Sequence, residues 1–265
     1  MHKALISRLP NLFRYINKVY HFSKTVHSMK DRRERPETSP QTMFISVFLC
    51  ALLRFGSIRM LAFEAKNRRI RKFIQNVDKD TFCGNTIANG LENIHTDILE
   101  QELTVVPKKL RRNKAYGTAE RPGTIGGLKI VAVDGTETYR STSINCDECL
   151  EYHVKTKGGI EVHYVHKVVI MQIVGRIHPS AVQAIMGIEK ILPRDVKEDR
   201  QVEGHEGEGT SAKRLIDKMI GLYGAQYFDV VTTDALYTNE PFVEFMNERN
   251  KYLVSRVKND MFFVT

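Results

Sequence analysis

The sequence predicts an α/β domain preceded by a basic, helical segment. Two observations indicate this. Apolar, β-branched runs alternate with helical patterns only after about residue 120, and the balance of charge changes at the same point. Residues 1–120 carry 22 Lys and Arg against 11 Asp and Glu, whereas residues 121–265 carry 18 against 20. With 265 residues, of which 42% are hydrophobic, the chain is long enough to bury an ordinary core.

The first part is expected to be all-α and basic. The apolar spacing in residues 1–36 suits an amphipathic helical arm, which ends in a linker. Residues 37–120 are expected to form a helical DNA-binding domain, although the same pattern is typical of any small helical bundle. Its helices are predicted over 42–54, 57–74 with Ser57 as the N-cap, and 86–103.

No membrane or export segment is expected. The apolar run MFISVFLCALL is too short to span a bilayer and is predicted to be a buried helix. The basic N-terminus is not followed by the apolar core of a secretory signal, so we expect a cytoplasmic protein.

A basic stretch, PKKLRRNKAYG, precedes the expected domain border near residue 120. Clustered Lys and Arg favour contact with nucleic-acid phosphates, because each neutralised phosphate releases condensed counterions. A solvated basic surface is the alternative. The candidate DNA-binding residues are Lys108, Lys109, Arg111, Arg112 and Lys114.

The second part, residues 121–265, is expected to be an α/β layered domain. Strands are predicted first, then helices alternate with strands. A helix starting at Thr210 has its apolar positions on one face. The predicted strands are 128–133, 161–175, one within 179–192, 227–233 and 251–258, and the second helix is 239–250.

Asp134 and Asp234 each close an apolar strand, and ligands usually bind at the carboxyl ends of strands in such sheets. They would be neighbours if their strands pair. Two close carboxylates repel each other and need a cation, and hard oxygen ligands suit Mg²⁺ or Mn²⁺. Two structural alternatives stay open. Asp-Gly is a common hairpin signal, and Asp234 could cap a helix that begins at Ala235.

The stretches DGTE, Cys-x-x-Cys-Leu, HYVHK, EGEGTSAKRL and DALYTNEPF, with a closing strand that ends in Lys258, resemble the transposases of bacterial insertion sequences. These are cut-and-paste Asp-Asp-Glu enzymes. The resemblance covers roughly residues 40–265. It implies an RNase H-like core, a mixed sheet flanked by helices, in residues 121–265. It also implies that Asp134 and Asp234 are the first two catalytic, metal-binding aspartates.

The resemblance further implies a reaction and its partners. Water, assisted by Mg²⁺ or Mn²⁺, would attack the phosphodiester at the transposon end, and the released 3′-hydroxyl would then attack target DNA. The implied partners are double-stranded DNA, as terminal repeats and target, and a second copy of the chain on that DNA. The implied location is the cytoplasm of a prokaryote, in association with the nucleoid.

One departure from the family pattern matters. The family's third ligand is a Glu on a helix after the fifth strand, and this chain stops at Thr265. We therefore expect a C-terminally truncated transposase with weak or absent cleavage. The alternatives are a fragment that occupies transposon ends without cutting, and a general RNase H-like nuclease without preference for those ends.

Cys146 and Cys149, with His163 and His166, suggest a tetrahedral zinc site. Because a strand alternates faces, the two histidines are expected to point in opposite directions, which favours a half-buried cysteine pair without metal. Whether the cysteines bind zinc stays open.

Other polar residues receive structural interpretations. Glu137 is expected to cap or pair at the surface. Glu206 and Glu208, just before the expected helix, suit the positive end of its dipole. Lys213 and Arg214 are expected on a solvated helix face.

Overall fold

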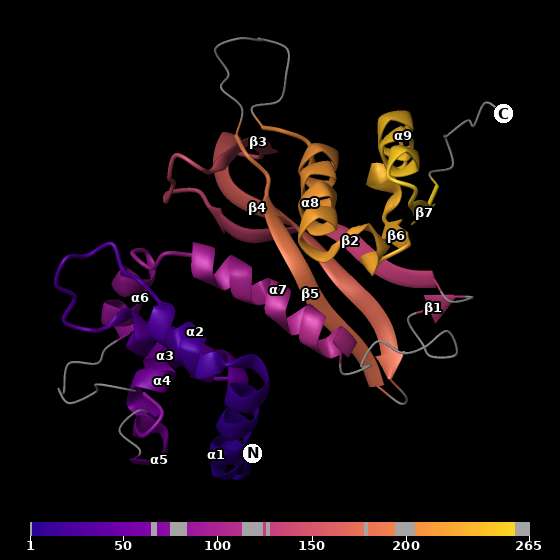
Figure 1. The fold of residues 1–265 in the computed structure, drawn as a ribbon. Helices are drawn as coiled ribbons and strands as arrows, with labels where there is room; N and C mark the ends of the chain where they lie inside the picture. The colour runs from indigo at the N-terminus through magenta and orange to yellow at the C-terminus, as the bar shows by residue number, and fades with distance from the viewer. Residues whose placement is uncertain are drawn as a thin grey trace. The chain divides into compact units, whose positions relative to one another are not determined.

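The computed structural model describes residues 2–64, 68–74, 84–112, 124–125, 128–177, 180–193 and 205–257. The chain divides into two compact units, Met1–Val105 and Val106–Thr265. The division falls inside a helix, α7 (Asp97–Arg112), drawn in magenta in Figure 1. The sequence placed the border near residue 120, and residues 113–123 lie outside the described part of the chain.

The described residues of the first unit form helices around one apolar cluster, in which Leu49, Leu61 and Ile87 are fully buried. Ser57 accepts a hydrogen bond from the Met60 N–H at 3.2 Å, which confirms its predicted capping role. The helices are α1 (His2–Tyr20), α2 (Phe22–Ser28), α3 (Pro40–Leu52), α4 (Ile58–Glu64), α5 (Arg68–Arg71), α6 (Gly84–Leu91) and the start of α7.

Two predicted helices differ from the structure. Residues 57–74 contain α4 and α5 instead of one helix. Residues 86–103 hold the end of α6 and the start of α7, with a turn at Asn93 between them, where Ile94 makes a β-bridge with Asp31. Within the described residues, no helix combines the length and apolar character needed to cross a membrane.

The second unit is a mixed α/β structure built on a seven-stranded sheet. β2 pairs antiparallel with β4 and parallel with β6, and β6 pairs parallel with β7. The other edge of β4 pairs first with β3 and then with β5. The strands are β1 (Thr124–Ile125), β2 (Leu128–Ser141), β3 (Leu150–Thr156), β4 (Gly159–Ile177), β5 (Ser180–Lys190), β6 (Val230–Thr233) and β7 (Tyr252–Ser255).

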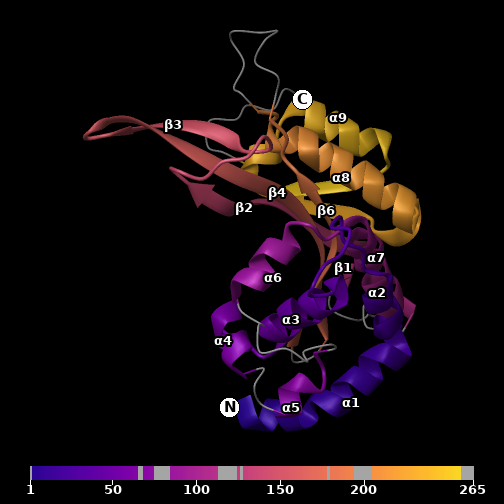
Figure 2. The ribbon, with the colours of Figure 1, turned by 90° about the vertical axis from the view of Figure 1, so that its left-hand side faces the viewer.

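Two helices cover one face of this sheet, α8 (Glu208–Tyr223) and α9 (Glu240–Glu248), as Figures 1 and 2 show. α8 packs on β4 and β5, and α9 packs on β7. The core between them includes the fully buried side chains of Met171, Leu215 and Phe228. Short 3₁₀ turns, η1 (Ala225–Tyr227) and η2 (Ala235–Tyr237), flank β6. The mixed sheet with flanking helices confirms the coarse α/β prediction.

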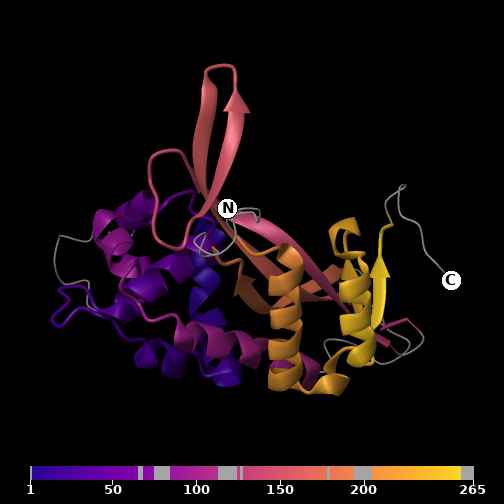
Figure 3. The same ribbon diagram turned by 90° about the horizontal axis from the view of Figure 1, so that it is seen from above.

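Three local predictions are corrected. β3 was not anticipated; it forms a hairpin with the first half of β4 that projects from the sheet in Figure 3. β2 does not turn at Asp134–Gly135 but runs on to Ser141, held by its ladder with β4, so the hairpin interpretation is wrong. α8 begins at Glu208 with Gly207 as N-cap, so Thr210 is not the cap.

Candidate functional site

Asp134 and Asp234 occupy the same level on two adjacent parallel strands. In the β2–β6 ladder, Ile130 pairs with Val230 and Ala132 pairs with Thr232. Each aspartate stands two residues beyond that last pair, Asp134 within β2 and Asp234 directly after β6. The two aspartates were expected to be neighbours if their strands pair, and the β2–β6 ladder confirms that the strands do pair.

The two carboxylates differ in what they contact. Asp134 lies opposite Ile170 of β4 and is exposed. Asp234 is also exposed, but its Oδ1 accepts a hydrogen bond of 2.9 Å from the Leu236 N–H, so it caps η2. The capping interpretation of Asp234 is thus confirmed. A carboxylate offers about four lone-pair directions, so this bond leaves others for a ligand.

A third carboxylate, that of Glu208, lies against β2 at Gly135, the residue after Asp134. A Cβ atom built on Gly135 would lie 2.5 Å from Cδ of Glu208 and closer still to Oε2. The Glu208 carboxylate fills the space that a side chain at residue 135 would take, so a larger residue there would displace it. Sequence reasoning attributed Glu208 to the helix dipole alone, and the glycine that follows Asp134 was the signal it missed.

Tyr237 contacts Glu208 and lies within electrostatic range of Asp134 and Asp234. Its side chain is fully buried, and its hydroxyl donates a hydrogen bond of 3.3 Å to Oε2 of Glu208. Burial raises the pKa of the Tyr237 phenol, and the negative charges of Glu208, Asp134 and Asp234 raise it further. The phenol therefore stays protonated at neutral pH and orients Glu208 as a donor.

The start of α8, and with it Glu208, is fixed by the buried Glu206. Its carboxylate accepts hydrogen bonds from the Leu192 N–H at 2.9 Å, the Ser211 hydroxyl at 2.8 Å and the Arg214 guanidinium at 2.8 and 3.0 Å. Burial by itself raises the pKa of Glu206, but these donors outweigh it and lower the pKa to about 2. Glu206 is therefore ionised and anchored at neutral pH.

Several other polar residues of this domain have structural partners. Arg214 also bonds Glu189 at 2.7 Å, so its assignment to a solvated face was wrong. Lys213 donates to the Pro241 carbonyl at 2.7 Å. Glu137 pairs with Arg140 at 2.6 Å, as expected for a surface pair.

The predicted DNA-binding residues fall on α7 or just after it. In the second unit, Lys108 lies 5.4 Å from the ring centre of Tyr223, and the Arg111 guanidinium lies 4.7 Å from that of Tyr227. A cation–π contact leaves the positive charge in place, because the ring has no formal charge. Lys109 and Arg112 belong to the last turn of α7, and Lys114 lies outside the described residues.

The three acids do not form a closed metal cage. Among the described residues, the ligand atoms that gather within 4.8 Å of one another in a group of three belong to Cys146, Cys149 and His166. The carboxylates of Asp134, Asp234 and Glu208 do not form such a group among the described residues.

A comparison of the chain with protein-family models, curated proteins and solved structures finds no match to any of them.

Proposed function

We propose that this chain is a DNA transposase of the Asp-Asp-Glu type and that Asp134, Asp234 and Glu208 bind its divalent metal ion. The observation that carries the proposal is the parallel β2–β6 pairing, which sets the two aspartates side by side. Apart from β1 and β3, the strands and long helices follow the order β2, β4, β5, α8, β6, α9, β7, which supports the RNase H-like core that the sequence resemblance implies.

The donor set fits Mg²⁺ or Mn²⁺. Both ions prefer carboxylate oxygens, and each acid is held by the fold in a different way. Asp134 is fixed by its place in the β2–β4 ladder, Asp234 by the Leu236 N–H, and Glu208 by the Tyr237 hydroxyl. When bound, the ion would neutralise charge on the phosphoryl oxygens and activate the attacking oxygen.

Glu208 changes the activity expected of the chain. The sequence-based expectation of weak cleavage assumed two carboxylates only. Glu208, in the first turn of α8 and against Gly135 of β2, is the proposed third carboxylate. We therefore expect metal-dependent cleavage by this chain, and we expect it to need Glu208.

The proposed partner is double-stranded DNA, as transposon ends and as target, with the chain acting as a dimer in the bacterial cytoplasm. Positive charge on the last turns of α7 would contact the phosphate backbone and position the duplex. The residues proposed for this contact are Lys108, Lys109, Arg111, Arg112 and Lys114.

Cleavage of labelled DNA that carries the element's own terminal repeats tests the proposal. We expect nicking at the repeat with Mg²⁺ or Mn²⁺, and its loss in Asp134→Asn and Asp234→Asn. The matched control is Asp147→Asn, which removes an exposed carboxylate from the loop between β2 and β3. Equal cleavage by Asp134→Asn and the wild type would refute the assigned site. Equal cutting of DNA without repeats would indicate a general nuclease instead.

A second candidate is a protein that binds transposon ends without cutting them. The wide spacing of the three carboxylates favours it, since the described residues gather no acidic triad within 4.8 Å. Its signature would be retention of the repeat DNA in a gel-shift assay, with no cleavage at any concentration of Mg²⁺ or Mn²⁺ and no effect of Asp134→Asn.

A further inference from the structure

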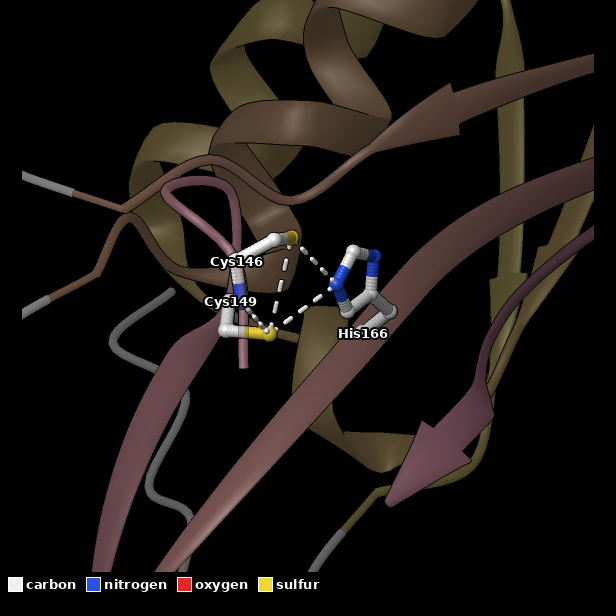
Figure 4. A group of neighbouring side chains, drawn as sticks. All are labelled: Cys146, Cys149 and His166. Atoms are coloured by element: carbon white, nitrogen blue, oxygen red, sulfur yellow. Dashed lines mark hydrogen bonds between the residues drawn. The ribbon is translucent and has the colours of Figure 1, made fainter. Parts of the chain in front are cut away.

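Cys146, Cys149 and His166 converge on one point, as Figure 4 shows. The two Sγ atoms are 3.7 Å apart, and Nε2 of His166 lies 3.3 Å from Cys146 Sγ and 3.1 Å from Cys149 Sγ. His163 takes no part, because its ring contacts Arg140 and Glu161. The two histidines thus separate as strand alternation predicts, and one of them joins the cysteines.

These distances fit tetrahedral zinc. With Zn–S near 2.3 Å and Zn–N near 2.05 Å, tetrahedral angles place two sulfurs about 3.8 Å apart, and sulfur about 3.6 Å from nitrogen. The Sγ–Sγ distance of 3.7 Å agrees closely, and the two S–N distances are a few tenths of an ångström short. A disulfide would need about 2.05 Å between the sulfurs. Both cysteines are free thiols.

The backbone around the cysteines is shaped to present both sulfurs on one side. The Cys149 N–H donates to the Cys146 carbonyl at 3.0 Å, and the Cys146 N–H donates to the Cys149 sulfur at 3.3 Å. The ring of His166 packs edge-on against Tyr139, its neighbour across the β2–β4 ladder. Cys149 is buried and Cys146 is exposed, which gives an ion a route from solvent.

The strand pairing explains what a metal would do here. β2 ends with Ser141 opposite Tyr164 on one edge of β4, and β3 begins with Leu150 opposite Val165 on the other edge. Both strands run antiparallel to β4, so residues 142–149 must cross a face of β4 to connect them. This crossing loop is exposed apart from Cys149, so little apolar burial holds it down.

We propose that Cys146, Cys149 and His166 bind one Zn²⁺, with a water molecule as fourth ligand, and that the ion fastens the crossing loop to β4. Binding would release the two thiol protons to solvent, and the two thiolates would balance the charge of the ion. The ion would stabilise the β3–β4 hairpin, because the site exists only when the loop lies across β4. The proposal is independent of the carboxylate site and of any reaction there.

Elemental analysis of the full chain, purified with reductant and then dialysed against trace Zn²⁺, tests the proposal. We expect one zinc per chain in the wild type, and loss of that zinc in the variants Cys146→Ser/Cys149→Ser and His166→Ala. The matched controls are Cys50→Ser, a thiol in the first unit, and His153→Ala, an exposed histidine on β3. Both controls should keep the metal. Removing a ligand should weaken Zn²⁺ binding by more than about 100-fold, since loss of supporting contacts alone costs 10- to 100-fold.

A measurement on the wild type alone tests the proposal even if the variants fail to fold. Co²⁺ added to the metal-free protein should give the intense near-ultraviolet absorption of thiolate coordination, and Zn²⁺ should displace it. Removal of zinc by a chelator should lower the melting temperature, and adding zinc back should restore it. Absence of the thiolate band, or zinc retained in the double cysteine variant, would overturn the proposal.

Discussion

The carboxylate of Glu208 lies against the backbone of Gly135. A Cβ atom at residue 135 would come within 2.5 Å of Cδ of Glu208. β2 therefore has a glycine at the position where the Glu208 side chain of α8 contacts it. This contact links the first turn of α8 to the position next to Asp134. It places a third acid against β2 at the residue after Asp134, on the face of the strand to which a side chain at residue 135 would point.

Gly135→Ala tests this contact without removing any acid. The added methyl group should push the Glu208 carboxylate aside, because the colliding atoms are at the free end of a flexible side chain. We expect metal-dependent DNA cleavage to fall by about 10- to 100-fold. The melting temperature should change little, since Gly135 does not have a positive φ that alanine would strain. Unchanged cleavage in this variant would show that the position of Glu208 is irrelevant to the reaction.

Tyr237→Phe should leave the Glu208 carboxylate without the hydrogen bond that orients it. The substitution removes the hydroxyl that donates to Oε2 and leaves the ring in its buried place. We expect Mn²⁺ affinity, measured by calorimetric titration, to fall by about 10-fold or more. Tyr227→Phe is the matched control, because the buried hydroxyl of Tyr227 has no hydrogen-bond partner among the described residues. Equal affinity in both variants would contradict a positioning role for Tyr237.

Glu206→Gln should destabilise the start of α8. Glu206 is 8% exposed and receives charged hydrogen bonds from Arg214, so we expect a loss of about 1.5–3 kcal/mol in the free energy of unfolding at pH 7. The pKa of Glu206 lies at about 2 in the folded chain, below its ordinary value of 4.5. Its stabilisation is therefore fully present above about pH 4.5 and is lost as the pH falls toward 2.

The pH dependence of that difference is the measurement. Denaturant unfolding of wild type and Glu206→Gln should differ at pH 7 and converge as the pH approaches 2. Glu148→Gln is the control, since Glu148 forms an exposed pair with Lys190 and exposed pairs contribute about 0–1 kcal/mol. A difference that stays constant down to pH 2 would contradict the role assigned to the ionised carboxylate.

Arg111→Gln should weaken DNA binding because it removes one positive charge. If Arg111 neutralises one phosphate, its loss should reduce the slope of log K against log salt by about 0.9 for duplex DNA. Fluorescence anisotropy between low and moderate salt measures that slope. Lys157→Gln, at the exposed turn of the β3–β4 hairpin, is the control and should leave the slope unchanged. An unchanged slope in Arg111→Gln would remove this residue from the proposed interface.

Much of the second unit is readable from its sequence, because apolar runs and capping residues are local signals. The first half of β2 and the strand before Asp234 were located this way, and Asn239 caps α9 where NEPF predicts a helix start. The sequence left the pairing of these two strands as a condition, and the ladder between β2 and β6 meets it.

Features that depend on contacts between residues far apart in the sequence could not be predicted from it. Gly135 looks like a turn residue, and only the Glu208 carboxylate shows why it belongs inside a strand. β3 lacks a strong strand signal because its burial alternates along a polar sequence, and its ladder with β4 holds it. The choice of His166 over His163 as the partner of the cysteines depends on which face of β4 the loop crosses.

The parallel pairing of β2 and β6 also determines which insertions and deletions in the chain would leave Asp134 and Asp234 side by side. About a hundred residues separate the two aspartates in sequence, yet their relative position depends only on a short ladder between two strands. Insertions in the β3–β4 hairpin, or in the segment before α8, would leave that ladder untouched. Deletion of one residue within β6 would instead turn Asp234 to the opposite face of the sheet.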